Sequence, residues 1–137
     1  MGFAYLGTLI DHGLGLSPLR FPLEVVVAVL LLTAGFLLRV WAAAHFYAHR
    51  MRVIVLHPQH DLITSGPFRF SRNPLYLGGN VFIFLGASLL LGSPAALLMT
   101  LAQLGLVDRM IRREERQLER DFGERWLHYR REVRRWL

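Results

Sequence analysis

The sequence predicts an all-α integral membrane protein with about three transmembrane helices. The chain has 137 residues, 53% of them apolar, which leaves room for a single domain over residues 1–137. No charged side chain occurs from Leu75 to Val107, and a soluble domain of this size could hardly cover such a run. Cysteine is absent, which excludes disulfides, thiolate metal sites and cysteine nucleophiles.

The first transmembrane helix is expected over residues 21–44. Glu24 and Arg39 lie near its two ends, where long charged side chains can reach the membrane interface. The apolar residues between and beyond them reach the roughly 20 needed to cross the hydrocarbon core. Residues 1–20 are apolar but contain Asp11 and several glycines. We expect a short interfacial helix or a fourth helix in that segment.

The long uncharged run predicts a helical hairpin, because it is too long for one span and Gly92-Ser93-Pro94 interrupts it. The two helices are expected over residues 75–91 and 95–107. Small residues on the first of them allow a neighbouring helix to approach closely, and these are Gly78, Gly79, Gly86 and Ala87.

Arginine placement predicts the orientation in the membrane. All 16 basic residues are arginine, against 10 acids. They concentrate in the loop 45–74 and the tail 108–137, and cytoplasmic segments carry the excess of positive charge. We therefore expect the N-terminus outside, and the loop, the tail and the active site on the cytoplasmic side of a prokaryotic inner membrane. The tail holds ten arginines but also seven acids, which argues against a nucleic-acid partner.

Apolar residues recur along the tail at spacings of three, four and seven, which predicts an amphipathic helix continuing from the third span. They are Ile111, Leu118, Phe122, Trp126, Tyr129, Val133 and Trp136. On this helix Glu114 falls about 60° to one side of the stripe and Glu115 about 40° to the other. A carboxylate facing lipid needs a cation, and an arginine such as Arg39 or Arg72 is one candidate. Gly123 is expected to end the helix, with a last segment starting at Glu124.

Four histidines in the loop permit a metal site. His45 and His49 are four residues apart, and His57 and His60 are three apart. Membrane oxygenases and desaturases bind metal through more histidines, including adjacent pairs that this chain lacks. The alternative is that these histidines only form hydrogen bonds at the interface, and no metal ligand is assigned.

Residues 60–79 read HDLITSGPFRFSRNPLYLGG. Residues 62–64 are expected to be extended and residues 65–67 to form a turn, with Asn73-Pro74 starting the second span. This string resembles the signature of the isoprenylcysteine carboxyl methyltransferase and phospholipid methyltransferase superfamily. The second half of that signature is matched by Glu114-Glu115, Leu118, Phe122-Gly123, Trp126 and Tyr129. The resemblance covers about residues 45–135.

The resemblance implies methyl transfer from S-adenosylmethionine at the membrane surface. The residues that match the cofactor-binding stretch of the superfamily are His60, Asp61, Leu62, Ile63, Phe68, Asn73, Pro74, Leu75 and Tyr76. Glu114 matches a cofactor-binding acid. Asn73 stands where the motif has histidine, so hydrogen bonding can survive but a cationic role is lost. Val53 occupies the position of an upstream cofactor-binding glutamine.

The methyl acceptor is expected to be a lipid-like or prenylated small molecule or peptide. Membrane lipid is also an expected partner. A carboxylate acceptor needs an arginine, and Arg109, Arg113 and Arg72 are the candidates. An amine acceptor needs a base, and Glu115 is the nearest suitable group. Two other functions stay open, a histidine-metal membrane oxidoreductase and a non-catalytic membrane scaffold.

Overall fold

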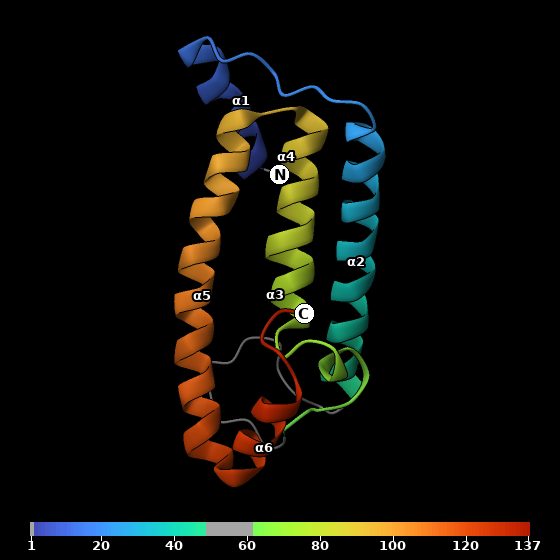
Figure 1. The fold of residues 1–137 in the computed structure, drawn as a ribbon, viewed down its shortest axis with the longest axis vertical. Helices are drawn as coiled ribbons and strands as arrows, with labels where there is room; N and C mark the ends of the chain where they lie inside the picture. Colours follow the sequence, from blue (N-terminus) through green and yellow to red (C-terminus); the bar gives the residue numbers. More distant parts are fainter. Residues whose placement is uncertain (1, 49–61) are drawn as a thin grey trace.

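The computed structural model describes residues 2–48 and 62–137, and in these residues the chain forms helices and no strands. The elements in order are α1 (Gly2–Leu14), α2 (Glu24–Ala48), the 3₁₀ helix η1 (Gly66–Arg69), α3 (Pro74–Tyr76), the π-helical η2 (Leu77–Ile83), α4 (Phe84–Leu91), α5 (Pro94–Phe122) and α6 (Glu124–Glu132). The long helices stand side by side in an elongated bundle (Figure 1). The all-α prediction is confirmed for the described residues.

In residues 2–48 and 62–137, three helices are long and apolar enough to cross a membrane. They are Glu24–Ala48, Pro74–Leu91, in which α3, η2 and α4 are continuous, and Pro94–Phe122. Each coincides with one of the three predicted spans. The first begins at Glu24 rather than at residue 21, directly after Leu23, whose φ of 67° is not helical. The third runs without a break into the charged tail, as the apolar stripe predicted.

The hairpin turn forms at the predicted breaker cluster. Gly92 ends α4 in the left-handed conformation, with φ of 61°, which glycine adopts without a steric penalty. The Ser93 side chain then accepts a hydrogen bond from the Ala96 backbone N–H at 3.0 Å, and Pro94 occupies the first turn of α5.

Helix α1 does form, but it is not a fourth span. It has 13 residues, about 20 Å of helix, which is shorter than the hydrocarbon core. It lies at the hairpin end of the bundle (Figure 1). The buried Asp11 attaches it there, because its carboxylate accepts hydrogen bonds from the Ser93 hydroxyl and, at 2.9 Å, from the Ala95 backbone N–H.

Helix α2 packs closely on η2 through facing glycines. A Cβ added at Gly78 would lie 2.7 Å from the Gly35 carbonyl oxygen, and the Arg39 side chain lies against Gly79. The predicted role of the glycines in close helix approach is confirmed at these positions.

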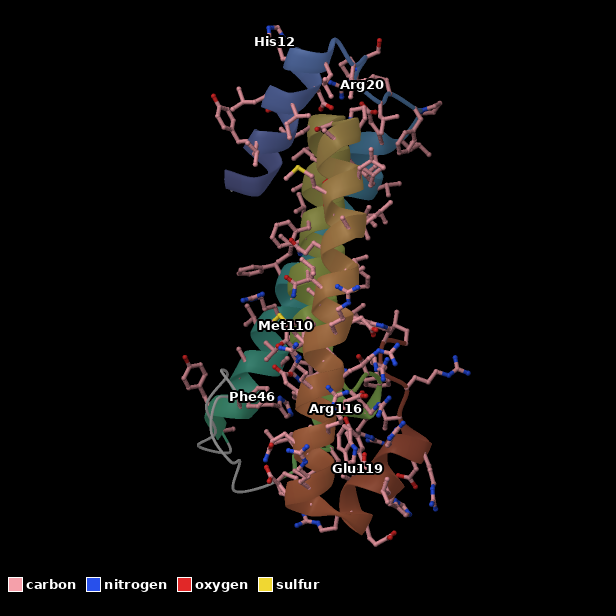
Figure 2. The ribbon with its side chains drawn as sticks, turned by 90° about the vertical axis from the view of Figure 1, so that its left-hand side faces the viewer. His12, Arg20, Phe46, Met110, Arg116 and Glu119 are labelled. Carbon is pink, nitrogen blue, oxygen red and sulfur yellow. The ribbon has the colours of Figure 1, made fainter. Side chains whose placement is uncertain are left out.

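At the opposite end the chain reverses after α5. Gly123, with φ of 52°, separates α5 from α6, as predicted. Figure 2 shows Arg116 and Glu119 near this end and His12 and Arg20 at the other. The apolar core of this end brings together residues from α2, the segment after residue 61 and α6, namely Ala42, Phe46, Ile63, Phe68, Trp126 and Tyr129.

Candidate functional site

A cavity of about 310 Å³ lies at the α6 end of the bundle. Its lining residues are Arg39, Phe46, Leu62, Ile63, Phe68, Arg72, Asn73, Pro74, Leu75, Tyr76, Asn80, Glu114, Leu118, Trp126 and Tyr129. Apolar and aromatic side chains thus surround a few polar and charged groups. Ligand sites for small molecules have this composition and begin at about this volume.

The structure brings together at this cavity every predicted cofactor-binding residue that it describes. Residues 62 and 63, Phe68 and residues 73–76 line one side, and Glu114 comes from α5. The two halves of the sequence motif, separated by the membrane hairpin, therefore meet in space. His60 and Asp61 lie outside the described residues.

Glu114 and Tyr76 form the acidic part of the cavity wall. The Tyr76 hydroxyl donates a hydrogen bond of 2.7 Å to the Glu114 carboxylate. Both side chains are only partly exposed, and among the described residues Glu114 forms no ion pair with an arginine. The cationic partner that the sequence required for this acid is thus not supplied by Arg39 or Arg72.

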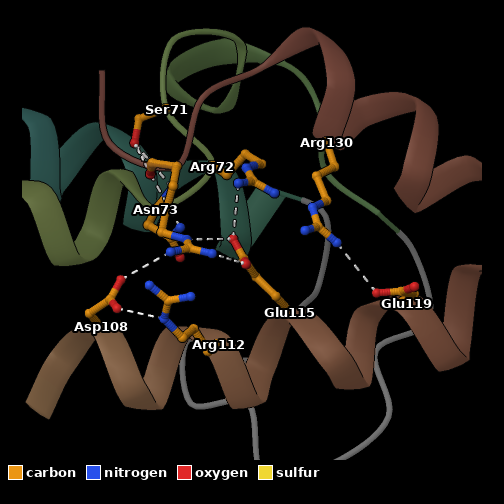
Figure 3. Close-up of polar contacts among 9 residues, drawn as sticks. Ser71, Arg72, Asn73, Asp108, Arg112, Glu115, Glu119 and Arg130 are labelled. Atoms are coloured by element: carbon orange, nitrogen blue, oxygen red, sulfur yellow. Dashed lines mark hydrogen bonds and ion pairs between the residues drawn. The ribbon is translucent and has the colours of Figure 1, made fainter.

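Glu115 lies outside the cavity lining, in a cluster of ion pairs (Figure 3). Its carboxylate is 2.7 Å from Arg135 Nη2 and 3.2 Å from Arg72 Nη2, and the residue is 6% exposed. Arg135 also pairs with Asp108 at 3.1 Å, and hydrogen bonds to these acids raise the Arg135 pKa. Successive residues of a helix diverge by about 100°, so Glu114 and Glu115 face different surroundings.

The structure does not bring the two other predicted catalytic residues to the cavity. Arg109 and Arg113 are exposed on α5 and are absent from the lining. Of the three arginines considered for a carboxylate acceptor, only Arg72 lines it.

The C-terminal segment after α6 holds the turn that carries Arg72 and Asn73. The Arg134 carbonyl accepts a hydrogen bond of 2.9 Å from the Arg72 backbone N–H. The Arg135 carbonyl accepts from the Ser71 hydroxyl at 3.1 Å and from the Asn73 side-chain amide at 3.3 Å. Asparagine in place of the motif histidine therefore anchors this segment. The local sequence does not predict these hydrogen bonds, because the residues that form them are more than 60 residues apart.

Tyr129 and Trp126 of α6 complete the cavity wall. The Tyr129 hydroxyl donates to the Phe68 carbonyl at 2.7 Å, and burial raises the Tyr129 pKa. The Arg72 guanidinium lies 5.5 Å from the centre of the Trp126 ring, a cation–π distance. Burial lowers the Arg72 pKa, and the charge of Glu115 opposes this shift. The tail stripe contained both aromatic residues, but it did not show that they face a cavity.

Of the four histidines considered for a metal site, only His45 lies in the described residues. In residues 2–48 and 62–137 no group of three or more candidate metal ligands occurs. His45 Nδ1 lies 3.1 Å from the Trp41 carbonyl oxygen. His49, His57 and His60 lie outside the described residues.

Three helices of the described chain are able to span a membrane, and a mostly apolar cavity lies at one end of their bundle, which fits an integral membrane protein. The sequence profile of the family described as phospholipid methyltransferase matches residues 23–125. The chain belongs to the phospholipid methyltransferase family, and this confirms the superfamily resemblance of its motifs. The family and the three apolar helices together fit an integral membrane enzyme. No curated protein and no solved structure matches the chain significantly.

Proposed function

We propose that this protein transfers a methyl group from S-adenosylmethionine to a carboxylate or amine of a lipid-like amphiphile, such as an isoprenylcysteine-like molecule. The observation that carries the proposal is the meeting of Leu62, Ile63, Phe68, residues 72–76 and Glu114 at one cavity. These are the segments that match the cofactor-binding motif, and they come together although the membrane hairpin separates them in the sequence.

The residues present fit the cofactor. Glu114 is a carboxylate without an arginine among its described contacts, in a mostly apolar cavity, where a cationic ligand is its natural partner. Phe68 and Tyr76 offer ring faces and edges for an adenine or a sulfonium. The bound cofactor supplies an electrophilic methyl group on sulfur. Glu114, Phe68 and Tyr76 would hold and orient it, and orientation provides much of the rate of such a transfer.

The acceptor decides whether a proton must move. A carboxylate acceptor would take the methyl group without losing a proton, so no base would be needed. With an amine, the nitrogen loses a proton to a base. Glu115, the base considered from the sequence, is paired with Arg72 and Arg135 and does not line the cavity. Arg72 does line the cavity. This arrangement favours an acidic acceptor over an amine.

The active site is proposed to face the cytoplasm of a prokaryotic cell. The cavity lies at the end of the bundle formed by α6 and the arginine-rich tail, and the hairpin turn lies at the other end. Arginine-rich segments stay on the cytoplasmic side.

Calorimetric titration of the detergent-purified protein with S-adenosylmethionine tests the proposal. The wild-type protein should bind. Glu114→Gln should keep the fold and weaken binding by about 1.5 to 3 kcal/mol, the range for a hydrogen bond to a charged group. Glu119→Gln is the matched control, because Glu119 is exposed on the same helix and absent from the cavity, and its affinity should be unchanged. Folded wild-type protein that does not bind S-adenosylmethionine would refute the proposed function.

A further inference from the structure

Three buried nitrogen atoms, in two residues that line the cavity, have no hydrogen-bond acceptor in the described part of the chain. They are Nε and Nη1 of Arg72 and Nε1 of Trp126. The Arg72 side chain is 8% exposed and Trp126 is 2% exposed, and both residues line the cavity. Buried donors in native proteins are nearly always paired, so unpaired donors at one site call for an acceptor from outside the described residues, such as a bound ligand.

The charge of Arg72 is only partly balanced. Among the described residues its one acidic contact is Glu115 at 3.2 Å, and that carboxylate also binds Arg135 through two hydrogen bonds, of 3.1 and 2.7 Å. Glu114, the acid in the cavity lining, is hydrogen-bonded to Tyr76 instead. Arg39 adds a second arginine to the lining. The described lining of the cavity therefore contains two arginines and one carboxylate.

The two donor residues are held in place before any ligand binds. The Arg72 backbone is bonded to the Arg134 carbonyl, and its guanidinium packs over the Trp126 ring. The unpaired Nε–H and Nη1–H groups of this guanidinium lie on different edges of its plane, and each can donate a charge-assisted hydrogen bond to an oxygen of a carboxylate or phosphate.

We propose that Arg72 and Trp126 form a subsite for an oxyanion, a carboxylate or phosphate group, of a molecule bound in the cavity. The inference deepens the proposed function and rests on it for the identity of that molecule. The oxyanion comes either from the carboxylate of the cofactor's methionine part or from the acidic group of the methyl acceptor.

Two variants remove the donors in different ways. Trp126→Phe keeps an aromatic ring but removes the indole N–H together with part of the ring volume, and it leaves both partners of the Arg72–Glu115 ion pair in the chain. Arg72→Lys keeps the charge and loses the Nε and Nη1 donors. Trp136→Phe and Arg112→Lys are the matched controls, since neither residue lines the cavity. Thermal unfolding shows which variants are folded, and Trp126→Phe decides the question if Arg72→Lys does not fold.

One arm of the experiment tests the cofactor as the source. Affinities for S-adenosylmethionine and for its decarboxylated analogue are compared by titration. If the cofactor supplies the oxyanion, the wild type prefers the carboxylate form roughly tenfold or more, and the folded variants lose that preference. The control variants keep it.

The second arm tests the acceptor. Binding of dodecanoate and dodecyl phosphate is compared with that of dodecanol by thermal stabilisation. If the acceptor supplies the oxyanion, one of the two anions stabilises the wild type more than the alcohol does, and the variants lose the difference. Folded variants that keep the wild-type preferences in both arms overturn the subsite. Anion preference without any S-adenosylmethionine binding would uphold the subsite and refute the proposed function.

Discussion

Glu114 and Glu115 show how two adjacent, chemically identical residues receive different roles from their surroundings. Glu114 lines the cavity beside Tyr76, whereas Glu115 is buried between two arginines. From the sequence, both residues are predicted to lie beside the apolar stripe and to need a cation as partner. The structure supplies arginines to Glu115, and this leaves Glu114 as the acid available to a cationic ligand.

Removal of the Glu115 charge should destabilise the protein. Glu115→Gln leaves Arg72 and Arg135 without their shared carboxylate, and breaking a buried ion pair on one side costs about 3 to 5 kcal/mol. Thermal unfolding in detergent measures the effect. Glu119→Gln breaks only an exposed pair with Arg130, 3.6 Å apart, and should cost less than about 1 kcal/mol. A Glu115→Gln protein as stable as the wild type would show that the cluster contributes nothing to the fold.

At the scale of elements, the contact between α2 and η2 positions one side of the site. Gly35 and Gly78 let the two backbones approach, and Arg39, one turn along α2, reaches the cavity lining. The π-helical segment η2 directly follows Tyr76, and π-helical segments occur frequently at functional sites. The apolar pattern of the second span did not distinguish it from an α-helix.

Two alanine substitutions should change stability in opposite directions. Gly78→Ala places a methyl group 2.7 Å from the Gly35 carbonyl oxygen and 3.1 Å from the Arg39 backbone nitrogen, so the helices must separate and stability should fall. Gly105→Ala meets nothing within 4 Å and should stabilise α5 by about 0.5 to 1 kcal/mol, through its better helix propensity. The two melting temperatures check the contact, and a Gly78→Ala protein that melts like Gly105→Ala would contradict it.

At the scale of the whole molecule, three spans place α1 and α6 at opposite ends of the bundle. With the arginine-rich end inside, the segment between α1 and α2 should be outside and α6 should be in the cytoplasm.

The absence of cysteine gives a direct test of this orientation. Single cysteines are introduced at the exposed Ser17, before α2, and the exposed Arg131, in α6. A membrane-impermeant maleimide added to intact cells should label Ser17→Cys and not Arg131→Cys, and both should react after lysis. Labelling of Arg131→Cys alone in intact cells would reverse the proposed topology.

The spanning helices, their order and the breaks at Gly92-Ser93-Pro94 and Gly123 could be predicted from the sequence alone, whereas the first span runs over Glu24–Ala48 and not over residues 21–44. The apolar runs predict the spans because their length matches the hydrocarbon core of a membrane. Gly92-Ser93-Pro94 and Gly123 predict the helix ends because the backbone conformations there favour glycine and proline. The family motifs likewise identified the stretch at residues 62–76, from which Leu62, Ile63, Phe68 and residues 72–76 line the cavity. These features depend on neighbours in the chain, so the sequence displays them.

Only the tertiary structure decided which charged groups face the cavity. Glu115 pairs with Arg135, 20 residues away, and Asn73 with the carbonyl of that arginine, 62 residues away. Arg72 and Trp126 become neighbours only because α6 folds back beside the turn before the second span. Such pairs form between segments that are far apart in the sequence, and the sequence pattern of each segment is compatible with many partners. Helical periodicity therefore predicts which side of a helix is buried but not which residues lie opposite that side.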